Sequence, residues 1–117
     1  MVDVKVTCVI ELDGKPMPGG HIEQRLACDR ASLFRGVQVP GGPSDLPQTT
    51  LTVPRMVLLR VERDVNIYVE QPNSESITLQ AGGFLLLWNI APTLPGAVAV
   101  QNLAVVDAPI EGLVAGS

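Results

Sequence analysis

The sequence has 117 residues, a formal net charge of −4 and a pI near 4.7. That length suits one domain with one hydrophobic core, which we place at residues 1–117. Charged residues make up 17% of the chain, where an average soluble domain has about 25%. A small domain has much surface for its volume, so part of this surface is expected to contact another molecule instead of water.

Two classes of partner are excluded by composition. Eight Lys and Arg residues are scattered along the chain and outnumbered by twelve acidic residues. Nucleic-acid binding needs a basic stripe, so we expect no nucleic-acid partner. The longest apolar run, Phe84–Trp88, is far shorter than the ~20 residues of a membrane-spanning helix. The alternating N-terminal residues also lack the apolar stretch of a secretory signal, and we expect no membrane association.

Helices are disfavoured, because 11 Gly and 10 Pro residues are spread along the chain. Strong alternation at residues 2–12 instead predicts a half-buried antiparallel strand that ends at the turn pair Asp13-Gly14. Further strands are predicted at 21–28 and 32–39. The Pro- and Gly-rich segment 40–47 predicts an extended loop, which is either an ordinary connection or an arm that lies on a neighbouring subunit.

The second half of the chain is denser in strand signals. Short strands are predicted at 56–62, 65–70 and 77–79, and the continuous apolar run 84–89 is typical of a strand covered on both faces. A strand is predicted at 97–106, with a bulge or bend at Gln101-Asn102 where the alternation changes phase. A last apolar segment covers 110–115. These elements predict an all-β fold, an antiparallel β-sandwich or jelly roll of about eight to ten short strands.

Residues that could carry catalysis are few. His21 is the one histidine and reads as a solvated loop residue, and the paired carboxylates stand at turns. We therefore expect no catalytic, metal or cofactor site. Cys8 and Cys28 are interpreted as free, buried thiols, with a disulfide across a hairpin centred near residue 18 as the alternative. Trp88 is expected in the core or at an interface.

The charge shortfall is concentrated near the C-terminus. From Gly82 to Ser117 the formal charges are Asp107 and Glu111 alone. Apolar strands without Lys would aggregate at a sheet edge unless a partner covers them, so this region is a candidate assembly interface, with a sandwich core as the alternative. The candidate interface residues are Val98, Val100, Leu103, Val105, Ile110, Leu113 and Val114.

Residues 57–106 carry a recognisable order of segments: Val57-Leu58-Leu59-Arg60, then a short Val/Ile strand, then Ile77-Thr78-Leu79 followed by Ala81-Gly82-Gly83 and an apolar run. This order resembles the C-terminal part of small virion structural proteins from tailed bacteriophages. The resemblance implies a non-enzymatic capsid decoration (cement) protein, a homotrimer made in the host cytoplasm that binds the major capsid protein at the capsid surface of the virion. The alternative is a tail or tail-tip component acting as an adhesion or receptor-binding module.

Overall fold

The computed structural model describes residues 1–45, 54–69, 76–90 and 98–117. Across those ranges the chain is built from β-strands, and it contains no helix that could cross a membrane. The strands are β1 (Val2–Leu12), β2 (Lys15–Cys28), β3 (Arg30–Gln38), β4 (Ser44–Asp45), β5 (Pro54–Val61), β6 (Val65–Val69), β7 (Ser76–Leu79), β8 (Phe84–Trp88), β9 (Val98–Asn102) and β10 (Ala108–Gly116).

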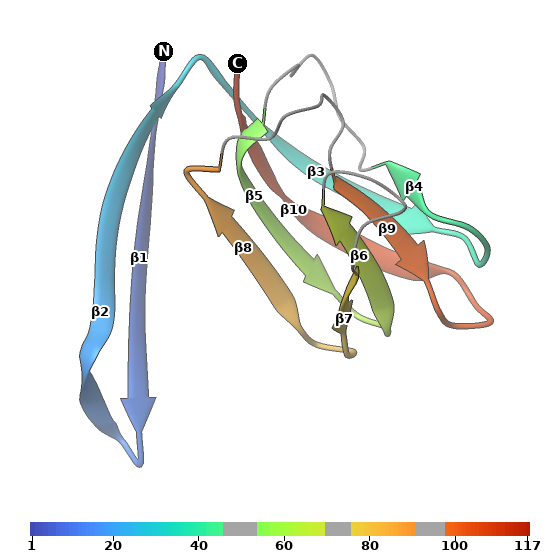
Figure 1. Ribbon diagram of the computed structural model, residues 1–117, viewed down its shortest axis with the longest axis horizontal. Helices are drawn as coiled ribbons and strands as arrows, with labels where there is room; N and C mark the ends of the chain where they lie inside the picture. Colours follow the sequence, from blue (N-terminus) through green and yellow to red (C-terminus); the bar gives the residue numbers. More distant parts are fainter. Residues whose placement is uncertain (46–53, 70–75, 91–97) are drawn as a thin grey trace.

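Strands β3 to β10 form two four-stranded antiparallel sheets, β3-β10-β5-β8 and β4-β9-β6-β7 (Figure 1). The first four of these strands pair with the last four in reverse order: β3 with β10, β4 with β9, β5 with β8 and β6 with β7. Rolling up this long ladder adds the pairs β5–β10 and β6–β9. The resulting strand order is that of a jelly roll, which confirms the predicted all-β sandwich.

The core lies between the two sheets and follows the period-two alternation of their strands. Leu59 of β5, Ile67 of β6 and Val100 of β9 are completely buried there. Phe84–Trp88 was predicted to be covered on both faces, and most of β8 is. Leu85 and Leu87 pack against the sandwich core, while Leu86 and Trp88 pack against a second cluster on the opposite face of the sheet. Trp88 therefore occupies an apolar cluster, as the sequence predicted.

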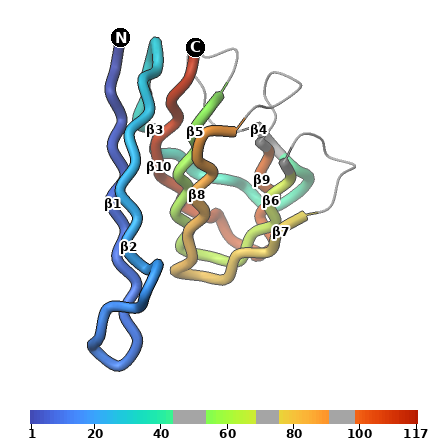
Figure 2. Tube along the Cα trace, turned by 60° about the vertical axis from the view of Figure 1, so that its left-hand side comes forward, coloured from blue at the N-terminus to red at the C-terminus, as the bar shows by residue number. Residues whose placement is uncertain are grey.

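Strands β1 and β2 form a separate two-stranded hairpin. Asp13 and Gly14 connect them, and both have positive φ angles, 53° and 77°, as the two central residues of a type I′ turn require. Figure 2 shows the hairpin and the two sheets as successive layers. In both views the closed end of the hairpin projects past the sheets, and the two chain termini lie together at the opposite end.

Strand β2 begins earlier than the sequence predicted. It starts at Lys15 instead of residue 21 and includes Pro16 and Pro18. The register shifts by one residue on β1 and four on β2, so that residues 17–20 stand opposite Ile10. A Cβ at Gly20 would lie 2.9 Å from the Ile10 carbonyl oxygen. This bulge absorbs the Pro- and Gly-rich segment without ending the hairpin.

Two predicted segments divide differently in the structure. The strand predicted at 97–106 ends at Asn102, and residues 103–107 form an irregular connection to β10. The change of phase at Gln101-Asn102 thus marks the end of a strand. Within the predicted loop 40–47, Ser44 and Asp45 pair with β9 of the same chain. The described part of that loop therefore lies on its own sheet, and residues 46–47 fall outside the described residues.

The two cysteines do not face each other. Cys8 pairs with Ile22, and Cys28 pairs with Val2 at the open end of the hairpin. Six positions separate the cysteines along the hairpin, about 20 Å of strand, whereas a disulfide needs Cα atoms within about 7 Å. Both thiols are free, because the hairpin is centred near its Asp13-Gly14 turn and not near residue 18. The free-thiol interpretation is confirmed.

Candidate functional site

The open end of the hairpin is fastened to the outer face of the sheet β3-β10-β5-β8. Val4, Leu26 and Cys28 are buried there in a cluster with Met56 and Ala115. Polar contacts support this packing. The Arg55 guanidinium donates to the carbonyl of Ala27 at 3.3 Å and to Asn89 Oδ1 at 2.7 Å, and the Asp29 amide donates to the Gly116 carbonyl at 2.9 Å.

The rest of the hairpin, residues 6–22, is here called the arm. The buried contacts of the hairpin with the sheet end at Val4 and Leu26. Beyond them, large apolar side chains of the arm are exposed to water: Val9, Ile10, Leu12, Met17 and Ile22. A two-stranded hairpin is only marginally stable in water without a layer packed against it. The arm therefore presents apolar surface without a covering layer in the described part of the chain.

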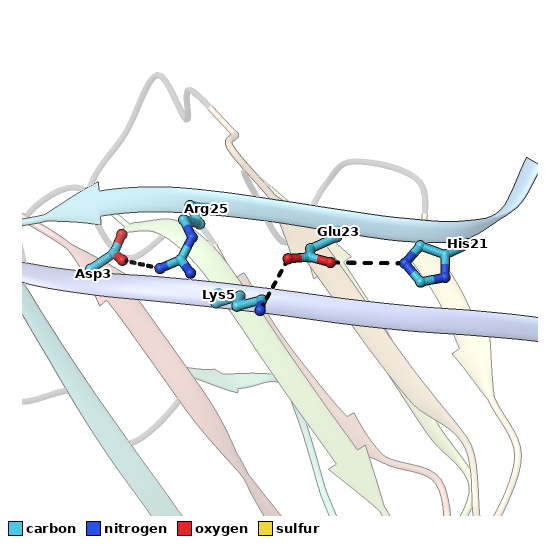
Figure 3. Close-up of polar contacts among 5 residues, drawn as sticks. All are labelled: Asp3, Lys5, His21, Glu23 and Arg25. Carbon is cyan, nitrogen blue, oxygen red and sulfur yellow. Dashed lines mark hydrogen bonds and ion pairs between the residues drawn. The ribbon is translucent and has the colours of Figure 1, made fainter.

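The opposite face of the hairpin is charged, as Figure 3 shows. Asp3 accepts from Arg25 at 2.8 Å, and Lys5 lies 3.0 Å from Glu23, whose other oxygen is 3.9 Å from His21. These residues alternate with most of the apolar ones along β1 and β2, whereas Val9, which pairs with His21, lies on the charged face. His21 stands on β2 rather than in a loop, and its side chain is largely exposed, so its solvated role is as predicted. This face is directed to water.

The outer face of the sheet is uncovered at the end away from the hairpin base. Three strands contribute a row of charges there: Glu111 on the central β10 lies opposite Arg35 on β3 and Arg60 on β5. Arg35 donates to Glu111 Oε2 at 3.1 Å and Arg60 to Oε1 at 3.4 Å. One carboxylate thus serves two exposed guanidinium groups, which leaves the row with a net positive charge.

Apolar side chains flank this charged row. Leu33 is 83% exposed on β3 and Phe84 is 66% exposed on β8. Between the row and the apolar side chains lies a shallow depression of about 520 Å³. We call this surface the sheet patch. The depression is lined by Leu33, Phe34, Arg35, Leu58, Arg60, Glu111, Gly112 and Leu113, and Phe84 lies on the neighbouring strand β8 opposite Arg60.

The residues predicted as an assembly interface are distributed over different environments. Val100, Ile110 and Val114 are buried in the sandwich core, and Leu113 is half-buried on the outer face. These side chains are covered by their own domain, because β9 and β10 are central strands and not edge strands. Leu103 and Val105 are exposed, with Val105 at 94%. The side chain of Val98 falls outside the described residues.

The sequence contained a signal for the sheet patch that the predicted interface did not use. In a strand at 32–39, Leu33, Arg35 and Val37 share one face, and Phe34 and Gln38 share the other. The first face is the exposed one, whereas Phe34 and Gln38 point inward and are buried. The arm carries a similar signal at its closed end, where the apolar residues Leu12 and Met17 flank the turn.

The described residues contain no group of three or more His, Cys, Asp or Glu that could hold a metal ion. The described residues instead form two surfaces that could bind a partner. One is the arm, which is apolar, and the other is the sheet patch, which is partly apolar and partly cationic. Comparisons with protein-family models, with curated proteins and with solved structures gave no match.

Proposed function

We propose that this chain is a non-enzymatic virion structural protein, a decoration (cement) protein that binds the major capsid protein and stabilises a phage capsid as a homotrimer. Two independent observations support the proposal. The order of segments in residues 57–106 resembles small phage virion proteins, and the jelly roll is an architecture common in viral capsid proteins. The jelly roll supports the proposal only by analogy between folds. The exposed surface of the arm is therefore the stronger argument.

The observation that carries the proposal is the arm. It is a long hairpin held at one end, and its remaining apolar side chains, such as Leu12 at 61% exposure, lie in water. Several large apolar side chains exposed on one small hairpin are typical of a protein–protein contact. A projecting hairpin can reach beyond its own domain to a neighbouring subunit, which suits a protein that reinforces a shell by burying surface rather than by turnover.

The second candidate function is a tail or tail-tip adhesion module. Jelly rolls also occur in lectins, and such a module would hold its ligand in a loop pocket or on an aromatic cluster. The sheet patch instead lies on the strands and is lined by Leu and Arg side chains. Leu and Arg on a broad, shallow surface suit a protein partner better than a glycan, which favours the shell-binding role.

The test is the location of the chain in a particle. Virions from the source of this sequence are purified, separated into heads and tails, and each fraction is probed for the chain by mass spectrometry. The proposal expects the chain in the head fraction, in a fixed stoichiometry to the major capsid protein. Its presence in isolated tails would support the adhesion module, and its absence from virions would overturn both.

Substitutions in the arm test whether the arm contacts the capsid. Replacing Leu12 and Met17 with Asp should reduce rebinding of the purified chain to heads stripped of it, because both side chains are exposed and apolar. Glu23→Gln changes a charge on the opposite face of the same hairpin and should rebind like the wild type. Equal rebinding of all three proteins would show that the arm does not contact the shell.

A further inference from the structure

We propose that the arm of one copy of this chain docks on the sheet patch of a second copy. The inference rests on the assembly proposed above and names the two surfaces that form it. Both surfaces are exposed in the same chain, both combine apolar and charged side chains, and their charges are opposite in sign. A second copy is therefore the occupant that the chain itself specifies.

The chain already contains a shorter version of this contact. At its base the apolar face of the hairpin packs on the same outer sheet face, through Val4 and Leu26 against Met56. The strands β8, β5 and β10 slant away from the hairpin toward their other ends (Figure 1), so the remaining part of the face stays uncovered. That remaining part is the sheet patch. The arm of a second copy would continue the layer that the hairpin base forms on this face of the sheet.

The arm has the length that this contact requires. From Val6 to Leu12 the arm spans six residues, about 20 Å at the rise of an antiparallel strand. A four-stranded sheet measures about 14 Å between its outermost strands. The closed end of the arm projects past its own sheets in both views. It can therefore cross the full width of a neighbouring sheet while its own base remains fastened.

The charges of the two surfaces complement each other. The closed end of the arm carries Glu11 and Asp13 against Lys15, a net charge of −1. The sheet patch carries Arg35 and Arg60 against Glu111, a net charge of +1, and Glu62 lies beside these three residues, outside the patch. Each guanidinium has five N–H donors and uses one on Glu111. Both arginines can thus donate to a second carboxylate without releasing the first.

The apolar side chains of the two surfaces also correspond. Leu12 and Met17 stand on either side of the turn, within a few residues of the acidic pair. On the patch, Leu33 and Phe84 stand on the strands at the two edges of the sheet. An arm-to-patch contact is head-to-tail, and such a contact forms a ring when the rotation between neighbouring copies closes. The proposed homotrimer is one such ring.

The test is self-association of the full chain, followed by sedimentation equilibrium. The wild type should associate reversibly, and two charge reversals should each weaken it: E11K/D13K on the arm and R35E/R60E on the patch. Each is expected to raise the dissociation constant about tenfold or more, because like charges then meet across the contact. The fourfold variant E11K/D13K/R35E/R60E restores opposite charges and should associate within a few-fold of the wild type.

Controls separate assembly from folding. Leu33→Asp changes a side chain that is 83% exposed, so it should fold normally, as judged by circular dichroism and thermal unfolding, yet associate weakly. Glu23→Lys reverses a charge on the opposite face of the hairpin and should associate like the wild type. A 12.4 kDa monomer at every concentration would overturn the inference, as would unchanged association of the charge reversals or no recovery in the fourfold variant.

The same proteins keep this inference distinct from the proposed function. Head binding by the wild type tests the decoration role, whereas sedimentation equilibrium tests the arm-to-patch contact. If Leu33→Asp becomes monomeric and still binds heads, the patch side of the contact is supported and head binding does not require self-association. If the wild type binds heads as a monomer, the decoration role stands and the arm-to-patch contact is wrong.

Discussion

Asn102 joins the two sheets of the sandwich, because its side-chain amide donates a hydrogen bond of 2.8 Å to the backbone carbonyl of Gln38. Gln38 ends β3 in one sheet, and Asn102 ends β9 in the other. The same amide donates to the Val106 carbonyl at 2.8 Å, and its oxygen accepts from the Ala104 amide at 2.8 Å. One buried side chain thus fixes both the sheet-to-sheet contact and the connection that leads into β10.

Replacing Asn102 with Ala should lower the free energy of unfolding by about 2–3 kcal/mol, since a buried carbonyl loses its donor and two further hydrogen bonds disappear. Urea denaturation measures this change. Gln80→Ala is the control, because Gln80 is an exposed amide side chain and its loss should cost less than about 0.5 kcal/mol. Similar values for the two variants would show that the Asn102 amide is not a link between the sheets.

Gly112 is required where β10 passes between β5 and β3. A Cβ at this position would overlap the Leu58 carbonyl and approach the Phe34 ring to 2.8 Å. Because these neighbours include backbone of a central strand, Gly112→Ala should destabilise the protein by more than about 3 kcal/mol. Gly42→Ala is the matched control, with no atom within 4 Å of the added carbon. Thermal unfolding of both variants decides the point, and a Gly112→Ala protein as stable as the control would contradict it.

The sequence predicted the strands well because alternation is a local property of the chain. It could not specify which strands become central. The charge-poor region after Gly82 was interpreted as a possible interface, yet β10 lies between β3 and β5, and β9 lies between β4 and β6. Alternate side chains of these strands, such as Val100, Ile110 and Val114, are buried in the sandwich core, which disfavours Lys and Arg at those positions. Edge and centre are set by long-range pairing, which alternation does not record.

The candidate site was less predictable for a related reason. Alternation at residues 2–12 identified an apolar face, but not how much of that face its own domain covers. The answer depends on the angle between the hairpin and the sheet, which leaves Val4 buried and Leu12 exposed. Likewise, Arg35, Arg60 and Glu111 are far apart in sequence and meet only because three strands pair in register.

The packing of the hairpin base on the sheet can be followed by the reactivity of the two cysteines of the hairpin. Cys28 is 3% exposed under the base, whereas Cys8 is half-buried on the arm, so a thiol reagent should modify Cys8 at least about tenfold faster. Arg55→Ala removes the contacts with Ala27 and Asn89 and should speed modification of Cys28 selectively. Arg25→Ala, which removes an exposed ion pair on the far face, serves as the control. Equal rates for Cys28 in both variants would mean that Arg55 does not hold the base.

Val100 and Val105 were predicted together as interface residues, and the structure separates them. Val100 is completely buried, so Val100→Asp should place a charge in the sandwich core and cost more than about 4 kcal/mol, a large part of the stability of a domain of this size. Val105 is 94% exposed, and Val105→Asp should change stability by less than about 0.5 kcal/mol. Urea denaturation of the two variants checks this contrast.

Because Val105→Asp should leave the protein folded, its sedimentation equilibrium reports on assembly alone. Weaker association would show that the loop 103–107 takes part in the contact between copies. Association equal to that of the wild type would show that Val105 lies outside this contact.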